Sequence, residues 1–423
     1  MIHFIALFLS IQSIYVLIKS LSFILRKKYN AAILYYPIFF FFFPIHTILD
    51  YLIGYPNYKK DIQRLTFPMQ DNDTNIIYYA FIIIINFILL YYVNKNKKII
   101  KDRKVAFNKN IKTISTILLT LGFLGPISIF FTSTPDIYIS YGNIRNYMDT
   151  PIYNEYSIVW LLTIISSFII LVIRLLYGKD ITLIKSVVLI SILAIDIYFN
   201  NKRLIYGTIV IYTFISFFYS KSTILNLIKI ISCTIIFSSL YINYSFNHKY
   251  NYKVNNDAVY ASLRHELGRD DVTKFAINKV IINDEKITEY IGQSYINIML
   301  AWIPRAYWKS KPYPYSQYLT SKVIRNKTGP ALKSWTITSS FYDEAIANFG
   351  IWGFILSIII LTFFLRNFDK SKTIVGQALP FSILILYTMT NMNWFVSLFY
   401  IYILYLIYNL LSLNIKFYKN ASN

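Results

Sequence analysis

The residues of this chain best suited to acid–base chemistry lie in and just after one long polar stretch, residues 243–340. Nine of the 20 acidic residues fall between residues 243 and 350. Asp343 and Glu344 are adjacent at the point where the polar stretch gives way to an apolar segment. Partly apolar surroundings raise the pKa of a carboxyl group toward neutrality, which suits it to act as a general base. Glu344 is our favoured base, and a helix cap or a structural ion pair is the alternative for it.

A cluster of charged residues lies near the start of this stretch. Apolar residues recur at helical intervals between residues 259 and 267, which predicts a short amphipathic helix lying on the membrane. Its polar side carries four ionisable residues: Arg264, His265, Glu266 and Arg269. The arginines could bind an anion, and His265 or Glu266 could replace Glu344 as the base. The alternative is a solvated charged face in which Glu266 pairs with both arginines.

Three prolines shape the next candidate segment. Tyr and Ile residues at helical intervals predict a second interfacial helix over residues 287–302, and prolines 304, 312 and 314 keep the following chain extended. Two cations are thereby held among four aromatic residues, and the full set is Arg305, Lys311, Trp302, Tyr307, Trp308 and Tyr313. Such neighbours suit a sugar ring stacked beside a diphosphate. They also suit a membrane interface, an alternative that is weaker for Arg305 because the prolines immobilise it.

Two arginines outside the polar stretch are further anion-binding candidates. Arg203 lies where two apolar segments meet the outer surface, with Asp196 a helical turn below it. A guanidinium at that depth is costly unless it binds a phosphate or a carboxylate. Asp196 is therefore its alternative partner. Arg145 is a weaker candidate of the same kind.

The sequence predicts no metal site and no cofactor. The one cysteine, Cys233, lies within an apolar segment, and the four histidines lack metal-ligand spacing. Asp71-Asn72-Asp73 superficially matches the metal-binding D-x-D of polyprenyl-phosphate-sugar transferases. Its polar neighbours favour a solvated loop instead.

The elements that position these groups are apolar helices. Hydrophobic residues make up 56% of the chain and charged residues only 15%, and apolar runs of spanning length recur. We predict an all-α polytopic membrane protein with about eleven (10–12) transmembrane helices. The predicted spans are 2–25, 31–54, 75–93, 111–131, 157–177, 181–199, 204–219, 223–241, 350–366, 373–392 and 394–415. The predicted organisation is one integral membrane domain: helices 1–8 over residues 1–242, the large loop 243–340, and helices 9–11 over residues 341–423.

Charge predicts the orientation. With the N-terminus outside and the C-terminus in the cytoplasm, the inner loops hold most of the Lys and Arg that lie outside the long loop, as the positive-inside rule requires. The long loop, with its short interfacial helices, is then extracytoplasmic. The net charge of +22 reflects lysines facing anionic lipid headgroups, so nucleic acid is not an expected partner.

Several of these features together resemble the Wzy-type polysaccharide polymerases of bacteria. The resemblance rests on many spans, one large outer loop and Arg203 opening a span. Its motifs are Arg264 with Gly268-Arg269, the string Ile303-Pro304-Arg305 to Trp308 with Lys311-Pro312, and Ser340 through Asn348-Phe349-Gly350. The order of the motifs and the topology carry the resemblance, since the family is highly divergent.

The resemblance implies a reaction on the outer face of the bacterial cytoplasmic membrane. A growing O-antigen, capsule or exopolysaccharide chain is moved from undecaprenyl diphosphate to the non-reducing end of a new lipid-linked repeat unit. A GT-C-like helical bundle, an undecaprenyl-diphosphate-linked oligosaccharide, and a flippase and chain-length co-polymerase as partners are also implied. Clustered cations would stabilise the diphosphate leaving group without a metal. Our candidates for that role are Arg203, Arg264, Arg269, Arg305, Lys311 and Arg145.

Two other functions stay open. A related lipid-linked-glycan transferase, such as an O-antigen ligase, would differ in its acceptor. A non-enzymatic flippase or transporter of lipid-linked oligosaccharide would need charges lining its spans, and few charges lie in mid-span here.

Overall fold

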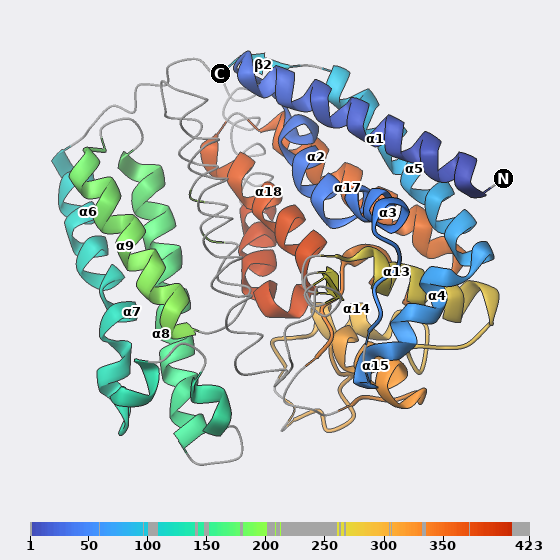
Figure 1. Ribbon diagram of the computed structural model, residues 1–423. Coiled ribbons are helices and arrows are strands. Elements are labelled where there is room, and N and C mark those ends of the chain that lie inside the picture. The colour runs from blue at the N-terminus through green and yellow to red at the C-terminus, as the bar shows by residue number, and fades with distance from the viewer. Residues whose placement is uncertain are drawn as a thin grey trace, which may run out of the picture. The chain divides into compact units, whose positions relative to one another are not determined.

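A computed structural model shows two compact helical units, which are described separately. The first unit is Met1–Lys98 with Asn256–Asn423, and the second is Ile99–Asn255. The structure describes residues 2–58, 60–95, 97–99, 109–139, 143–147, 152–177, 181–200, 208, 212, 260–261, 264–265, 268–303, 305, 307–331, 336–371 and 373–407. Figure 1 shows the helices of both units.

Apolar helices form the N-terminal part of the first unit. They are α1 (Ile2–Leu25), α2 (Ala31–Phe42), α3 (Pro44–Leu52) and α5 (Asn72–Asn94). Pro44 begins α3 and interrupts the apolar run, because proline fits the first turn of a helix but breaks its interior. Strand β1 (Lys28–Tyr29) pairs with β2 (Lys98–Ile99), where the first unit ends.

A buried polar contact joins three of these helices, which lie side by side in Figure 1. The Asn86 side chain of α5 donates to Ser13 Oγ of α1 at 2.8 Å and to Gln12 Oε1 at 3.2 Å. The Tyr36 hydroxyl of α2 donates to Asn86 Oδ1 at 2.9 Å. Such hydrogen bonds stabilise helix packing where apolar faces alone would not fix the register.

The long polar stretch and the first polar loop contribute short helices to the same unit. They are η1 (Lys60–Leu65), α4 (Thr66–Gln70), α13 (Asp270–Ala276), the π-helical turn η7 (Ile277–Ile282), α14 (Gln293–Met299), α15 (Tyr315–Arg325) and α16 (Phe341–Phe349). The predicted helix over residues 287–302 is wrong in its extent, because the chain turns at Gly292 with φ +74° and only α14 forms. Helix α15 was not predicted.

The C-terminal part of the first unit returns to apolar helices. They are α17 (Ile351–Lys370), α18 (Ile374–Met389), the short η8 (Met392–Phe395) and a helix over Val396–Ile407. Gly350 separates α16 from α17 with φ +57°, a conformation that glycine tolerates best. Helices α16 and α17 then pack so closely that a Cβ on Gly353 would lie 2.3 Å from the Ala345 carbonyl oxygen.

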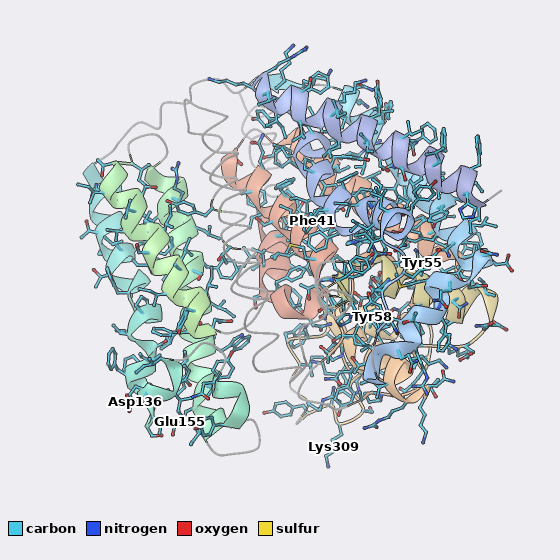
Figure 2. All side chains as sticks on the ribbon, viewed as in Figure 1. Phe41, Tyr55, Tyr58, Asp136, Glu155 and Lys309 are labelled. Atoms are coloured by element: carbon cyan, nitrogen blue, oxygen red, sulfur yellow. The ribbon has the colours of Figure 1, made fainter. Side chains whose placement is uncertain are left out.

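The described part of the second unit contains three longer helices and several short ones. Its elements are α6 (Lys109–Gly122), α7 (Leu124–Ile127), η2 (Ser128–Phe131), η3 (Pro135–Tyr138), η4 (Asn143–Tyr147), α8 (Ile152–Tyr177) and α9 (Leu183–Asn200). Asp136 of η3 and Glu155 of α8 lie toward the same end of this unit (Figure 2). Glu155 accepts a hydrogen bond from the Ser133 backbone N–H at 2.7 Å.

Asp196 is buried between helices of the second unit. Its Oδ2 accepts hydrogen bonds from Ser166 at 2.7 Å and from Ser167 at 3.1 Å. Gly125 of α7 has no side chain to obstruct the carboxyl, since a Cβ there would overlap Asp196 Oδ1. The alternative partner suggested for Asp196, Arg203, lies outside the described residues. The two serines are therefore the partners of Asp196 that the structure describes.

The apolar helices agree with an all-α membrane protein. Among the described residues, four helices are long and apolar enough to span a bilayer: Ile2–Leu25, Ala31–Leu52, Asn72–Asn94 and Ile351–Lys370. Shorter apolar helices cover Thr116–Phe131, Ile158–Arg174, Gly376–Met389 and Val396–Ile407. All of these fall on predicted spans. The predicted spans 204–219 and 223–241 lie outside the described helices, so the total of eleven stays a prediction.

We expect Gly353→Ala to destabilise the protein, because the new methyl group meets backbone atoms of Ala345 that cannot rotate away. Overpacking of this kind costs about 1–3 kcal/mol. The matched control is Gly122→Ala, where the nearest atoms belong to the flexible Ile170 side chain. Thermal denaturation of the purified protein measures the effect. Equal melting temperatures for the two variants would contradict the close packing of α16 on α17.

Candidate functional site

The two carboxyl groups singled out in the sequence sit at the start of α16. Ser340 is the N-cap of this helix, and Asp343 Oδ1 accepts hydrogen bonds from the Ser340 backbone N–H at 2.6 Å and hydroxyl at 2.5 Å. Asp343 is therefore a helix-capping residue, a role that short polar side chains fill at helix starts. The cap fixes the first turn of α16, which also carries Glu344.

Glu344 is completely buried and is only partly satisfied. Its Oε2 accepts a hydrogen bond from the Tyr387 hydroxyl of α18 at 3.0 Å. Its Oε1 has no hydrogen-bond partner among the described residues. Asn348 supports the turn from below, since its side chain donates to the Glu344 carbonyl at 2.7 Å and to Ser294 Oγ at 2.9 Å. A buried oxygen without a partner is costly, and this one is free to receive a proton.

Burial raises the pKa of both carboxyl groups to about 7. The hydrogen bonds from Ser340 and the charge of Arg269 lower the pKa of Asp343 but do not outweigh burial. The hydroxyls of Ser294 and Tyr387 have the same lowering effect on the pKa of Glu344. A carboxyl group that titrates near neutrality can take up and release protons at physiological pH, which is what general acid–base chemistry requires.

A network of buried charges surrounds Arg264. Its guanidinium Nη2 lies 2.8 Å from Asp50 Oδ1 of α3 and 2.6 Å from Asp270 Oδ2 of α13. Lys274, one turn further along α13, lies 3.2 Å from Asp50 Oδ2 and 3.7 Å from Asp270 Oδ2. We call Arg264, Asp50, Asp270 and Lys274 the charge network. Two cations face two carboxylates in it, so it is balanced.

The charge network is shielded from solvent. Burial lowers the pKa of Arg264, but the carboxylates of Asp270 and Asp50 outweigh that effect and leave the pKa above its ordinary value. Burial raises the pKa of Asp270, and the cations of Arg264 and Lys274 oppose the rise. The Lys274 ammonium also lies over the Tyr78 ring, 5.1 Å from its centroid. Because the guanidinium of Arg264 is already paired with protein carboxylates, these contacts favour a structural role for it.

Arg269 links the charge network to the carboxyl pair. Its backbone N–H donates to the Phe42 carbonyl at 3.0 Å, and its Nε donates to the Met389 carbonyl at 2.7 Å. These bonds tie the start of α13 to α2 and α18. Of the predicted cations that the structure describes, Arg269 is the one whose charge acts on Asp343.

His265 also meets a carboxylate in this region. Its Nδ1 lies 3.5 Å from Asp271 Oδ2, which accepts a hydrogen bond from the Tyr58 hydroxyl at 3.0 Å. Tyr58 lies inside the first unit (Figure 2). His265 thus borders the charge network, whereas Glu266 lies outside the described residues.

The proline-bounded string holds its cations within itself. The guanidinium of Arg305 donates to the carbonyls of Lys311 at 2.6 Å and Pro312 at 3.0 Å. It lies 3.8 Å from the centroid of the Tyr313 ring. The Lys311 ammonium donates to the carbonyls of Ala301 at 2.9 Å and Ile303 at 2.8 Å. These bonds favour a structural role for both cations.

Two of the four aromatic residues of the string are exposed, whereas Trp308 and Tyr313 are half-buried. Tyr307 is 87% exposed and Trp302 is 69% exposed. Trp308 donates its indole N–H to Ser310 at 2.9 Å. Lys309 in the same string projects away from the helices (Figure 2). This exposure fits a membrane-interface role as well as sugar stacking.

The structure describes the remaining candidate residues only in part. Arg203 lies outside the described residues, and Arg145 lies in η4 with its side chain outside them. Asp71 of the D-x-D match is the N-cap of α5 and accepts a hydrogen bond from the Thr74 backbone N–H at 3.0 Å. Burial raises the pKa of Asp71, but the hydrogen bonds from Thr74 outweigh burial and hold this pKa below its ordinary value. Asp71 therefore serves the fold. Within the described residues no group of three or more His, Cys, Asp or Glu is arranged to hold a metal.

Sequence reasoning missed Asp50, Lys274 and Tyr387. Asp50 could have been found from the sequence, because an acid at the end of an apolar run is energetically costly without a partner. The sequence evidence for Lys274 is weaker and consists of its position four residues after Asp270 on one helix. Nothing in the sequence distinguishes Tyr387 from the other tyrosines, of which the chain has 39 in all.

The chain matches no protein-family model, no curated protein and no solved structure.

Asp270→Asn is expected to destabilise the protein strongly, because it leaves Arg264 and Lys274 buried with one carboxylate between them. Breaking a buried pair costs about 3–5 kcal/mol. Glu285→Gln is the milder comparison, since Glu285 is about a third exposed and the new amide oxygen can still accept from the ammonium groups of Lys279 and Lys322, so a smaller loss is expected. Thermal denaturation compares the two. Similar losses in both variants would show that the charge network does not hold the fold.

The raised pKa values predict that stability falls as pH rises. An ordinary carboxyl has a pKa of about 4, and those of Asp343 and Glu344 are about 7 in the folded protein. Their protonated forms therefore favour folding, and this contribution, full below about pH 4, is lost as pH rises through about 7. Ionisation of each group should lower the free energy of unfolding by about 2–3 kcal/mol between pH 5 and pH 8.

The double variant Asp343→Asn/Glu344→Gln tests this pH dependence, because amides keep the hydrogen bonds to Ser340 and Tyr387 but do not ionise. We expect it to lose much less stability than wild type between pH 5 and pH 8, measured by denaturation at each pH. Parallel pH profiles for the two proteins would contradict the raised pKa values.

Proposed function

We propose that the chain is a Wzy-type polymerase, a membrane glycosyltransferase that extends a glycan on the outer face of the bacterial cytoplasmic membrane. The observation that supports the proposal is the buried carboxyl pair Asp343 and Glu344, whose pKa values lie near 7 at the junction of a long polar stretch with a spanning helix. The proposal includes a GT-C-like bundle, a membrane-lipid environment, and a flippase and chain-length co-polymerase as working partners.

In the proposed reaction Glu344 is the general base. The hydroxyl at the non-reducing end of the incoming repeat unit attacks the anomeric carbon of the growing glycan. The new C–O bond forms as the bond to undecaprenyl diphosphate breaks, and the electron pair of that bond leaves with the diphosphate. The hydroxyl proton passes to the free Oε1 of Glu344. A base with a pKa near the working pH makes this transfer efficient.

The diphosphate requires cations that are not already neutralised by the protein. Arg264 is paired with Asp50 and Asp270, so we assign it to holding the site. Arg269 is not a member of the charge network, bonds the Met389 carbonyl and lowers the pKa of Asp343 by its charge, and it stays a candidate phosphate ligand. Arg203 and Arg145 remain predicted phosphate ligands from the sequence. Cations at a developing negative charge lower the barrier most when they are fixed in advance.

One observation favours a second function, a flippase or transporter of lipid-linked oligosaccharide driven by protons. Asp343 and Glu344 are both sealed from solvent. Buried carboxyls that titrate near neutrality are typical of proton relays in transporters. A ligase would share the chemistry of the polymerase and differ only in its acceptor.

The test is complementation of a deletion of this gene in the source strain, with surface glycan read on a gel. Wild type should restore a ladder of chain lengths, and Glu344→Gln should abolish it at equal expression. General bases contribute about 10²–10⁴-fold to rate. Because glutamine mimics the protonated carboxyl that the fold favours, Glu344→Gln should remain folded. Glu285→Gln is the matched control and should restore the ladder.

The form of the deletion phenotype separates the functions. A single capped repeat unit in the deletion supports polymerisation, whereas complete loss of surface glycan points to a flippase or a ligase. A normal ladder with Glu344→Gln would remove this residue from the role of base.

A further inference from the structure

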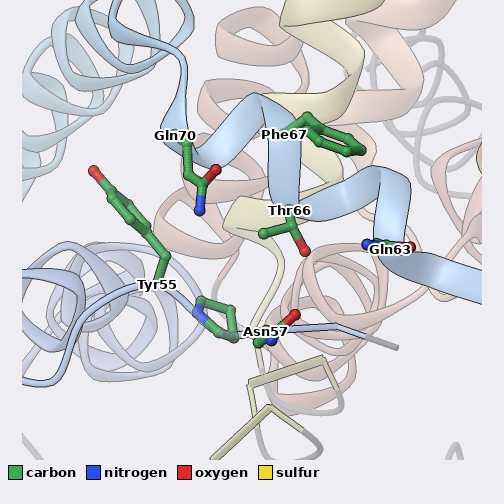
Figure 3. A pocket seen from close by; sticks show the side chains of 7 residues that line it. Tyr55, Asn57, Gln63, Thr66, Phe67 and Gln70 are labelled. Carbon is green, nitrogen blue, oxygen red and sulfur yellow. The ribbon is translucent and has the colours of Figure 1, made fainter. Parts of the chain in front are cut away.

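A surface pocket lies in the first unit, outside the groups discussed so far. It has a volume of about 320 Å³, at the lower end of the range for small-molecule sites. The lining residues are Tyr55, Pro56, Asn57, Gln63, Thr66, Phe67 and Gln70. Figure 3 shows the segment that bears Tyr55 and Asn57 on one side and the helical turns that bear Thr66, Phe67 and Gln70 on the other.

The polar groups of the pocket are neutral and available. Asn57, Gln63 and Gln70 are exposed carboxamides, and each carboxamide both donates and accepts hydrogen bonds. The hydroxyl oxygen of Thr66 is buried, so it is not open to a ligand as the three carboxamides are. A sugar hydroxyl also donates and accepts, so this set matches a ring bearing several hydroxyls. No charged side chain is among the described residues that line the pocket.

Two aromatic rings supply the apolar part. Tyr55 and Phe67 both line the pocket, and their side chains are 41% and 63% exposed. Exposed rings beside neutral polar groups suit a ligand with one apolar face and a polar edge, which is the character of a pyranose ring. A purely apolar ligand would leave the carboxamides without partners.

The walls of the pocket are held from behind. Asn75 donates to the Met69 carbonyl at 2.7 Å, and Arg64 donates to the Val323 carbonyl at 3.0 Å, which fixes η1 and α4. Tyr260 donates to the Gly54 carbonyl at 3.1 Å, which fixes the opposite segment just before Tyr55. A site whose walls do not need to be ordered on binding loses less affinity to entropy.

The pocket also adjoins the charge network. Burial raises the pKa of the Tyr55 hydroxyl, and the charges of Lys274, Asp50 and Arg264 are close enough to affect it. Tyr58, three residues further on, is bonded to Asp271. The segment that lines the pocket is therefore anchored to the same framework that supports the carboxyl pair.

We propose that this pocket binds an uncharged sugar residue of the acceptor glycan. That the sugar belongs to the acceptor glycan rests on the proposed function. That the pocket binds a sugar rests on the pocket itself. The pocket would hold a neutral hexose or N-acetylhexosamine better than a uronic acid, since none of the described residues that line it offers a cation to a carboxylate. It would thereby help to select which repeat unit is extended.

Saturation-transfer NMR on the full chain in lipid nanodiscs tests the proposal. The probes are galactose and N-acetylglucosamine as neutral sugars and glucuronic acid as a charged one. We expect transfer to the neutral sugars and markedly less to glucuronic acid. The double variant Asn57→Ala/Gln70→Ala should bind the neutral sugars about tenfold more weakly, since each lost hydrogen bond contributes about 0.5–1.5 kcal/mol. Its exposed side chains make no bond that the fold needs, so its melting temperature should match wild type.

Phe130→Ala is the matched control, because it removes an exposed aromatic ring outside the pocket and outside every residue proposed to bind sugar. It should bind the sugars as wild type does. Equal signals from wild type and the double variant would overturn the proposal. Preferred binding of glucuronic acid would also overturn it, as would sugars that only added lipid displaces. If sugar binding depends on Asn57 and Gln70 while Glu344→Gln still restores the glycan ladder, the general-base assignment fails and the pocket stands.

Discussion

The first unit depends on one buried set of ion pairs. Arg264 and Lys274 meet Asp50 and Asp270 with side chains that are at most 4% exposed, so each charge requires the others. The pairs join α3 near the N-terminus to α13, more than 200 residues later. Arg269 then carries the connection to α2 and α18 through backbone carbonyls. Because a mispaired charge in this interior is so costly, the network selects one arrangement of helices.

That arrangement creates the environment of Asp343 and Glu344. Helix α16 packs against α13 and α18, which excludes water from the first turn of α16 and raises both pKa values. Each acid uses one oxygen and keeps the other without a partner among the described residues. The bonded oxygen of Asp343 caps its own helix, whereas that of Glu344 accepts from Tyr387 of α18. The two adjacent acids therefore differ in what holds them in place.

The sequence was informative where the signal was local. Uninterrupted apolar runs predicted α1, α5 and α17, and the polar-to-apolar junction predicted partly desolvated acids at residues 343 and 344. It could not show that Asp50 pairs with Arg264, because long-range pairing leaves no pattern in one chain. Nor could it show that Arg305 and Lys311 bind carbonyls of their own string, since backbone partners have no sequence signature. A cation set among aromatics and prolines looks the same whether it holds a loop or a ligand.

The balance of charge in the network also limits where a diphosphate can bind. Inserting such an anion between Arg264 and its carboxylates would place like charges together in a buried space, which costs more than the arginine returns. Under the proposed function, a lipid diphosphate would therefore have to meet cations outside the network. The pocket at Tyr55 and Gln70 differs in its chemistry, because the described residues that line it offer carboxamides and carry no charge. The proposed glycan transferase would need both kinds of surface, and the buried ion pairs would keep the two chemically separate.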